Sequence, residues 1–450
     1  MHTNQSSKQD NLSTLRSYER GRLLNPIAHR LIPAGCHTYA KGDDQYPEQA
    51  PPFLVRGNGC RVWDLDGNEF IEYGMGLRAV TLGHAFDPVI QAVAHQLHCG
   101  ANFTRPAPIE VECAAELLSV IPGADMAKFC KDGSMANDGA IKLARAHTGR
   151  DMIAICGDHP FFSTNDWFIG TTEMPDGIPD WTRRHTVKFR YNDLGSLEEL
   201  FTRFAGQIAC VMMEAARTEE PKPGFLEGVK AIAHQHGAIF ILDEMITGFR
   251  WHLNGAQHTY GVTPDLSTFG KALANGFSVS ALVGKRELME LGGADHSLER
   301  VFLLSTTHGA ETHGLAAAIA TVRFYKQHQV VETLYARGER LRLGIVRTVS
   351  ELKLQGYFEL IGRDTNLLFS TRDADRRPSQ PFRTLFLQEL IKRGVIAPSF
   401  VVSYSHMESD IDRTVEIVSE ALWIYRRALE DGVDKYLQGR PVKLVFRRFA

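Results

Sequence analysis

Short apolar runs alternate with amphipathic segments through the middle of the chain. The runs lie at 152–156, 208–215, 238–244 and 278–284. Each has the length of a buried strand. Between two of them, an amphipathic segment repeats apolar positions every three or four residues and ends in Gly237, as a helix with a glycine at its C-terminus does. Buried strands separated by helices predict an α/β fold with a mostly parallel sheet covered by helices on both faces.

The pattern changes towards the two ends of the chain. Residues 59–74 alternate apolar and polar positions around an Asp-Gly pair and predict a hairpin, whereas 88–100 and 111–126 have helical spacing. The polar first twelve residues predict disorder, and we expect a helix over 12–32 that ends before Pro33.

The length of 450 residues allows at least two domains. The last hundred residues mix helices with short strands and predict an α+β domain. We expect residues 81–335 to form a large domain with the parallel sheet, residues 336–450 to form a C-terminal small domain, and residues 1–80 to contribute an N-terminal segment to that small domain.

Composition narrows the classes of function. Lysine and arginine total 50 against 53 acidic residues, so the net charge of −3 provides no basic field for nucleic acid. No apolar run approaches the roughly 20 residues of a membrane span, and the polar N-terminus lacks the apolar core of a signal peptide. Seven cysteines without CxxC spacing predict free thiols in a cytoplasmic protein and no metal site.

Candidate chemistry lies where the predicted strands end, because ligands of parallel sheets bind beyond the carboxyl ends of the strands. After KFC at 128–130, Gly133 and Ser134 open a predicted helix whose free N–H groups suit a phosphate. A serine in this place also fits an ordinary helix cap.

Asp243 comes at the end of the run at 238–244. A carboxylate there is desolvated and needs a cationic partner, such as a protonated ring nitrogen. The alternatives are a helix cap or a salt bridge to Arg250.

Lys271 follows a glycine and precedes small residues. Burial among them would lower the pKa of its amine and make it a nucleophile, whereas a surface lysine in a loop is the alternative. A phosphate cup, an acid for a ring nitrogen and a reactive amine, in this order on a parallel sheet, are the groups that pyridoxal phosphate requires.

Longer strings resemble a known family. VWDLDGNEFIEYGMGLRAVTLGH, IKLARAHTGRD, LDEMITGFR, DLSTFGK and PSFVVSYSHMESDID are similar to segments of the class III, ornithine-type aminotransferases of fold type I, and within them to glutamate-1-semialdehyde aminomutase and its relatives. The resemblance runs from about Leu31 to Asp412. It implies a large domain with a mostly parallel sheet, a smaller α+β domain and a pyridoxal phosphate cofactor.

The resemblance also implies roles for individual residues. Lys271 is implied to form the Schiff base (the internal aldimine) and Asp243 to contact the pyridine nitrogen. Gly133 and Ser134 stand where the family holds the phosphate. Thr307, in STTHGAETHG, matches a threonine that reaches the phosphate of the neighbouring subunit, which implies a homodimer with shared active sites.

Departures from the family pattern bear on cofactor contacts. Glu214, expected to contact the cofactor region, is followed by alanine where the family has proline, and Met135 replaces a glutamate. The family's aromatic residue that covers the cofactor ring is absent. His159, Phe161 or Phe162 can replace it; His159 is nearest the expected position, and all three also fit plain packing.

Further departures bear on the substrate. Lys41 replaces the arginine that grips the substrate carboxylate, and Arg78 is a candidate substitute that also fits an ion pair on the small domain. The region near 397–406 is shorter than in the aminomutases and lacks their gating glutamate.

We therefore predict an aminotransferase that moves an amino group from an amino-acid donor to a carbonyl acceptor, such as a keto sugar or an unusual keto acid. The alternative is an aminomutase, which returns the nitrogen to a neighbouring carbon of the same molecule. A non-catalytic binding module is disfavoured, because both Lys271 and Asp243 are retained.

Overall fold

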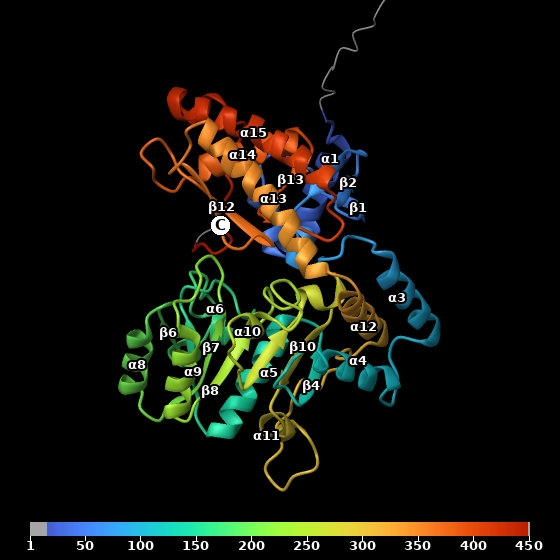
Figure 1. Ribbon diagram of the computed structural model, residues 1–450, viewed down its shortest axis with the longest axis vertical. Helices are drawn as coiled ribbons and strands as arrows, with labels where there is room; N and C mark the ends of the chain where they lie inside the picture. The colour runs from blue at the N-terminus through green and yellow to red at the C-terminus, as the bar shows by residue number, and fades with distance from the viewer. Residues whose placement is uncertain (1–15, 449–450) are drawn as a thin grey trace, which may run out of the picture.

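The computed structural model describes residues 16–448. Figure 1 shows two groups of elements, a large sheet with its helices below and a helix-rich group with smaller sheets above. The disorder predicted for the first twelve residues lies outside the described residues, as does the start of the helix predicted over 12–32. Its described part forms α1 (Glu19–Leu31).

Within residues 16–448, the large sheet has seven strands. In spatial order they are β4 (Met126–Cys130), β10 (Ser280–Gly284), β9 (Leu266–Phe269), β8 (Ile239–Asp243), β7 (Ile208–Glu214), β5 (Met152–Cys156) and β6 (Thr186–Phe189). β10 runs antiparallel to β4 and β9, and the other neighbouring pairs are parallel. The prediction of an α/β fold with a mostly parallel sheet is confirmed.

The four apolar runs predicted as strands became β5, β7, β8 and β10, which are buried at every position because helices cover both faces. The sequence interpretation missed β6 and β9. In β9, Ser267 and Thr268 interrupt the apolar pattern that would indicate a buried strand. Both polar residues are buried in the sheet, so tertiary packing overrode the local pattern.

Helices flank this sheet in Figure 1, with α8 and α9 towards one end and α3, α4 and α12 towards the other. Their bounds are α3 (Asp87–Cys99), α4 (Pro108–Leu118), α5 (Gly133–Thr148), α6 (Asp166–Ile169), α7 (Asp180–Arg184), α8 (Leu194–Arg203), α9 (Phe225–Gln235), α10 (Ala256–Thr259), α11 (Arg286–Met289) and α12 (Thr312–Gln327). The helix predicted over 111–126 ends earlier, at Leu118, because a turn is needed before β4 begins.

The upper group combines both ends of the chain. Its elements are β1 (Leu54–Asn58), β2 (Arg61–Asp64), β3 (Glu69–Glu72), α2 (Met75–Arg78), α13 (Val330–Glu351), β11 (Phe358–Ile361), β12 (Asn366–Thr371), α14 (Gln380–Lys392), β13 (Val395–Ile396), β14 (Phe400–Val401) and α15 (Glu408–Asp431). The predicted hairpin at 59–74 is β2 and β3. β13 joins that hairpin in parallel, with Val395 opposite Ile71, so distant parts of the sequence share one sheet.

Two loop-borne contacts tie the groups together. Arg363, after β11, pairs with Glu220, after β7, through N–O distances of 2.8 and 2.9 Å. The guanidinium of Arg363 also lies over the ring of Trp251, 4.5 Å from its centroid. Because the carboxylate accepts both hydrogen bonds of a planar fork, the relative position of the two loops is well defined.

Three further features concern membrane spans, metal sites and cysteines. In residues 16–448, no helix combines the length and apolar character that crossing a membrane requires. The same residues contain no cluster of three or more His, Cys, Asp or Glu side chains arranged for a metal ion. All seven cysteines are free.

Gly338 offers a test of the packing of α13. A Cβ at this position would overlap the backbone carbonyl of Asp364, which cannot move as a side chain can. We expect Gly338→Ala to lower the free energy of unfolding by about 2–3 kcal/mol, despite the better helix propensity of alanine. Urea denaturation of the matched variant Gly195→Ala, in an open position of α8, should show no loss. Equal stability of both variants would contradict this packing.

Candidate active site

The carboxyl ends of β7, β8 and β9 bring three polar residues side by side. Glu214 is the register neighbour of Asp243, and Asp243 is the register neighbour of Thr268. Lys271 comes two residues after β9 ends and adopts a left-handed backbone conformation, with φ of 38°. The site therefore lies where ligands of parallel sheets bind.

Asp243 is buried and held by two hydrogen bonds. Its Oδ1 accepts from the backbone N–H of Met245 at 2.8 Å, and its Oδ2 accepts from Nδ2 of Asn137 at 2.8 Å. Burial raises the pKa of Asp243, and the charge of Lys271 and these hydrogen bonds oppose the rise. The alternative of a salt bridge to Arg250 is wrong, since that guanidinium donates to the backbone carbonyls of Ile246 and Arg78.

Lys271 is a half-buried residue whose amine is desolvated. Burial lowers the pKa of this amine, and the carboxylates of Asp243 and Glu214 act in the opposite direction. Among the described residues, no acid lies within the 4.0 Å of an ion pair with its Nζ. Lys271 and Asp243 therefore interact electrostatically without forming an ion pair.

The start of α5 lies beside these residues. Asp132 caps the helix by accepting from the N–H of Met135 at 2.9 Å, so the capping alternative for Ser134 is wrong. Oγ of Ser134 accepts from the backbone N–H of Thr164 at 3.0 Å, which leaves its hydroxyl hydrogen available for another acceptor. At Gly133 a Cβ would lie 2.8 Å from Sδ of Met245, so the close approach requires glycine.

His159 and Glu214 meet at the end of β7. Nδ1 of His159 accepts from the backbone N–H of Glu214 at 3.1 Å, and burial, with a contribution from Arg217, lowers the pKa of His159 to about 3. The imidazole is therefore neutral with its proton on Nε2. Of the two alternatives, Phe162 is packed in the core and Phe161 is 42% exposed.

The side chain of Glu214 is buried and incompletely paired. Its Oε2 has no hydrogen-bond partner among residues 16–448. Burial and the neighbouring Asp243 raise the pKa of Glu214 to about 7, and the charges of Arg217, Lys271 and Arg78 limit the rise. A carboxyl group with this pKa exchanges its proton near neutral pH.

Arg78 reaches the site from a strained turn. The four residues of α2 all have positive φ, with values of 44° at Met75, 58° at Gly76, 58° at Leu77 and 72° at Arg78. Left-handed backbone costs roughly 1–2 kcal/mol for each non-glycine residue, so surrounding contacts must hold it. Arg250, which is 0% exposed, donates to the carbonyl of Arg78 at 2.5 Å and supplies one such contact.

The guanidinium of Arg78 binds neutral groups. Its Nε donates to Oδ1 of Asn366 at 3.0 Å, and a terminal nitrogen donates to Oγ of Ser399 at 3.3 Å. No ion pair forms with Arg78 among the described residues, so the predicted alternative of an ion pair on the small domain is wrong. Burial and the charge of Arg217 lower the pKa of Arg78 to about 10, and it stays cationic at neutral pH.

Two of the predicted residues make no contact with this cluster within the described chain. Lys41 is exposed, in a short 3-10 turn over Tyr39–Lys41. Thr307 is exposed, and its carbonyl accepts from Nδ2 of Asn102 at 3.0 Å. Their proposed roles stay predictions.

Sequence reasoning missed two residues of the site. Asn137 links Asp243, the carbonyl of Phe162 and, through its Oδ1, the hydroxyl of Thr268. Arg217 brings a positive charge near Glu214. Asn137 lies one helical turn after Gly133, on the buried face of α5, and this spacing was a usable signal. Arg217 lies in a loop without periodicity, so no local pattern could have indicated it.

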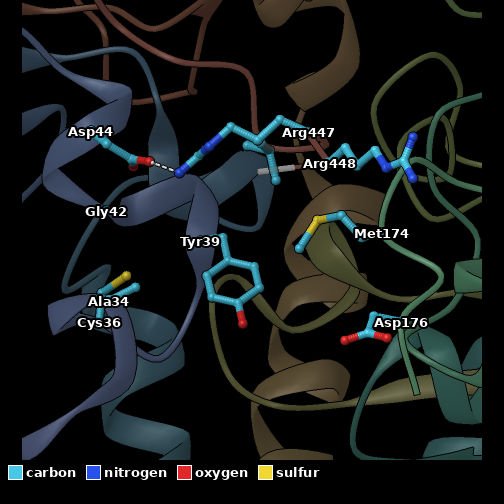
Figure 2. A pocket seen from close by; sticks show the side chains of 10 residues that line it. Ala34, Cys36, Tyr39, Gly42, Asp44, Met174, Asp176, Arg447 and Arg448 are labelled. Atoms are coloured by element: carbon cyan, nitrogen blue, oxygen red, sulfur yellow. Dashed lines mark hydrogen bonds and ion pairs between the residues drawn. The ribbon is translucent and has the colours of Figure 1, made fainter. Parts of the chain in front are cut away.

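A separate cavity of about 380 Å³ lies between the N-terminal segment, the loop before α7 and the C-terminal tail. Figure 2 shows Tyr39 and Met174 bordering it, and the ion pair of Asp44 with Arg447, 2.6 Å long, on one side. Its lining includes none of the predicted site residues, although Tyr39 shares a turn with Lys41.

The cluster fits pyridoxal phosphate. The buried acid at 243 has no cation in ion-pair contact among the described residues, as expected if a ring nitrogen is to take that place. The desolvated amine at 271 is separated from it. The start of α5 offers backbone N–H groups and the free hydroxyl hydrogen of Ser134 for a phosphate.

Glu214 generates a prediction on pH. Because its pKa rises from the usual 4.5 to about 7, the folded protein binds more protons than the unfolded chain between these values, and stability falls as pH rises through them. Glutamine cannot ionise, so we expect the stability of the Glu214→Gln variant to fall less than that of the wild type between pH 5 and pH 8. Urea unfolding of the cofactor-free protein at pH 5 and pH 8 measures it; parallel pH profiles of the variant and the wild type would contradict the prediction.

Comparison with known proteins agrees with this geometry. A family model described as aminotransferase class-III matches residues 44–353. The 3-aminobutyryl-CoA aminotransferase of Cloacimonas acidaminovorans is 32% identical over 90% of this chain and 96% of its own, and the glutamate-1-semialdehyde 2,1-aminomutase of Desulforamulus reducens is 30% identical over 90% and 98%. The FumI protein of Sphingopyxis sp. MTA144, solved in its pyridoxal phosphate internal aldimine form, superposes with a TM-score of 0.84 at 28% identity, covering 94% of this chain and 99% of that one.

Fold, family match and relatives therefore lead to one assignment. The chain is an enzyme of fold type I whose cofactor is pyridoxal phosphate. It belongs to the class III family of aminotransferases.

Proposed function

We propose that this enzyme transfers an amino group from an amino-acid donor to a carbonyl acceptor, with Lys271 and Asp243 as its catalytic residues. The observation that carries the proposal is the pair of desolvated, oppositely charged groups that attract one another without forming an ion pair. In a structural salt bridge the amine of Lys271 and the carboxylate of Asp243 would be in contact, whereas a cofactor ring that binds between them requires them to stay apart.

Bound pyridoxal phosphate supplies an electron sink for the carbanion that forms when the α-proton of the donor leaves. Asp243 keeps a proton on the ring nitrogen. The hydrogen bonds from Asn137 and from the N–H of Met245 stabilise the ionised carboxylate of Asp243 and fix its orientation. Lys271 binds the cofactor through its amine and, once displaced by the donor, moves the α-proton. Its lowered pKa favours the unprotonated amine, which both steps require.

The other proposed contacts to the cofactor are inferred from where the residues lie around Lys271 and Asp243. Gly133 and Ser134 hold the phosphate at the start of α5. His159 covers the ring, a role supported by its neutral imidazole and by the hydrogen bond that fixes its tautomer. The packing of Phe162 and the exposure of Phe161 favour His159 over both. Glu214 borders the cofactor on the side of His159.

Lys41 and Arg78 are the proposed substrate-binding residues among those predicted. Arg78 is better supported, because its charge acts on both Glu214 and Lys271.

A homodimer with shared active sites is part of the proposal, with Thr307 reaching the phosphate of the partner. Support comes from the exposure of Thr307 and of nearby apolar side chains, with Leu298 65% and Phe302 70% exposed. Large exposed apolar groups close together are typical of protein interfaces. In Figure 1 the loop that follows α11 extends away from the body of the subunit, as an arm towards a partner would.

The free cysteines support a cytoplasmic location. The two groups of elements in Figure 1 support a division into a large domain over 81–335 and a small domain built from 1–80 and 336–450.

An aminomutase remains the second candidate, because aminomutases are among the relatives and share the cofactor chemistry. The absence of a gating glutamate near 397–406 favours the aminotransferase, which must release its intermediate product. The donor half-reaction distinguishes the two.

We expect the yellow holoenzyme, mixed with glutamate or alanine, to release a stoichiometric 2-oxo acid as its absorbance changes to that of the amino form. Release is measured with a coupled dehydrogenase. Conversion of 4,5-diaminovalerate into glutamate semialdehyde without any 2-oxo acid release from amino acids would refute the aminotransferase assignment.

Variants test the two catalytic roles separately. Lys271→Ala should abolish the chromophore that borohydride fixes to the protein and lower the half-reaction rate at least about 10³-fold. Asp243→Asn should retain the borohydride-fixed chromophore and lose about 10²-fold or more in rate, since a neutral amide cannot hold the ring proton. Lys435→Ala, on an exposed turn, is the control and should behave as the wild type. Full activity of Lys271→Ala would exclude its role.

A further inference from the structure

Arg217 has a cationic side chain with no protein partner among residues 16–448. It lies three residues after the end of β7, in the loop that leads to α9, and it is half-buried. Within residues 16–448 its guanidinium forms no hydrogen bond and no ion pair. A guanidinium has five N–H donors, so this one is available to bind a ligand.

The two acids that follow Arg217 in the sequence do not neutralise it. Glu219 accepts from Nδ2 of Asn192 at 2.9 Å. Glu220 accepts from Arg363 through both oxygens and from the hydroxyl of Tyr260 at 2.6 Å. Both carboxylates are therefore committed to partners on other segments.

The charge of Arg217 acts on the active site. Alongside burial, it lowers the pKa of His159 and of Arg78, and it opposes the rise in the pKa of Glu214. These three residues border the proposed cofactor position. Arg217 therefore lies within electrostatic reach of the place where a donor or acceptor must bind.

The charges on this side of the site do not balance. Within the described part of the chain, the guanidinium of Arg78 has only the neutral partners Asn366 and Ser399. The acid that both guanidinium groups influence is Glu214, which is in ion-pair contact with neither among the described residues and whose pKa of about 7 leaves it partly protonated at neutral pH. Arg78 and Arg217 repel one another, and Glu214 compensates their charge incompletely, so an added anion relieves that repulsion.

The loop is also fixed in place. Glu220 holds it to Arg363, and the carbonyl of Arg217 lies beside Gly362, where a Cβ would be 3.4 Å from that oxygen. Gly362 and Arg363 belong to the segment between β11 and β12. Because the backbone on either side is anchored, little backbone ordering has to accompany ligand binding, which favours affinity.

We propose that Arg217, together with Arg78, binds a carboxylate of the substrate on the side of the active site next to Glu214 and His159. This rests on the proposed aminotransferase function and adds a residue that determines which donors bind. The planar forks of two guanidinium groups match the geometry of a carboxylate. Donors with a carboxylate are selected over simple amines, and Arg217 acts on binding rather than on proton transfer.

Calorimetric titration of the holoenzyme with glutarate, a dicarboxylate without an amine, tests binding apart from turnover. We expect Arg217→Met to weaken glutarate binding about 10- to 100-fold, the loss of a charge-assisted hydrogen-bond pair. Arg217→Lys should retain part of the affinity. Arg426→Met, on the exposed face of α15, is the matched control and should bind as the wild type does. Arg217→Gln provides the same comparison should the methionine variant not fold.

Kinetics supply the second readout. For glutamate, Arg217→Met should raise KM about 10- to 100-fold with a much smaller change in kcat, whereas turnover of 2-aminopropane, which has no carboxylate, should be unchanged. Unaltered glutarate affinity and KM in a folded Arg217→Met variant would overturn the inference. So would wild-type binding of inorganic phosphate but not of glutarate. If the wild type converts no amine at all, the proposed function fails; if it converts them and the variant matches it, only the role of Arg217 fails.

Discussion

The hydrogen bond from Asn137 to Asp243 is the interaction on which the site depends. A carboxylate buried at the end of a central strand is costly unless donors compensate it. Asn137 donates to it from α5, and its own carbonyl oxygen is satisfied by the hydroxyl of Thr268 on β9. One amide thus joins a helix and two strands. Since α5 also carries Ser134, the same helix sets the position of the proposed phosphate site relative to the acid.

Around the hydrogen bond from Asn137 to Asp243, several charged groups of the candidate site lack an ion-pair partner among the described residues. Among residues 16–448, Lys271 and Asp243 form no ion pair and one oxygen of Glu214 has no hydrogen-bond partner. Arg78 and Arg217 have no counter-ion in contact within the same residues. Such an arrangement lowers the stability of the protein without ligand. A charged ligand that binds these groups restores the lost stability. The core around it is well packed, and the left-handed turn at Arg78 is held by a fully buried arginine. The strain is therefore localised at the proposed cofactor and substrate site.

The two arginines proposed to bind the substrate come from segments that are far apart in the sequence. Arg78 comes from the N-terminal segment and contacts Asn366 and Ser399 near the other end. Arg217 comes from the loop that follows β7 of the large sheet, and Arg363 binds Glu220 in the same loop. Motion between the two groups of elements would change the distance between these guanidinium groups. The paired contacts of Glu220 and Arg363 oppose such motion.

Local sequence determined the elements whose patterns are purely apolar. β5, β7, β8 and β10 were predictable because every position is buried, and the hairpin of β2 and β3 was predictable from its Asp-Gly turn. The residues that follow these strands, together with short specific strings, were enough to predict the pyridoxal phosphate cofactor that the family match supports, with Lys271 and Asp243 as the residues proposed to contact it. What the tertiary structure decided was different in kind. β9 is a strand although Thr268 is polar, because the Thr268 hydroxyl donates to Oδ1 of Asn137 on α5. Arg217 is left without an ion pair among the described residues because the two acids that follow it are bound by other segments. Neither fact is local: a polar residue shows its role only when its partners, or their absence among the described residues, are known in three dimensions.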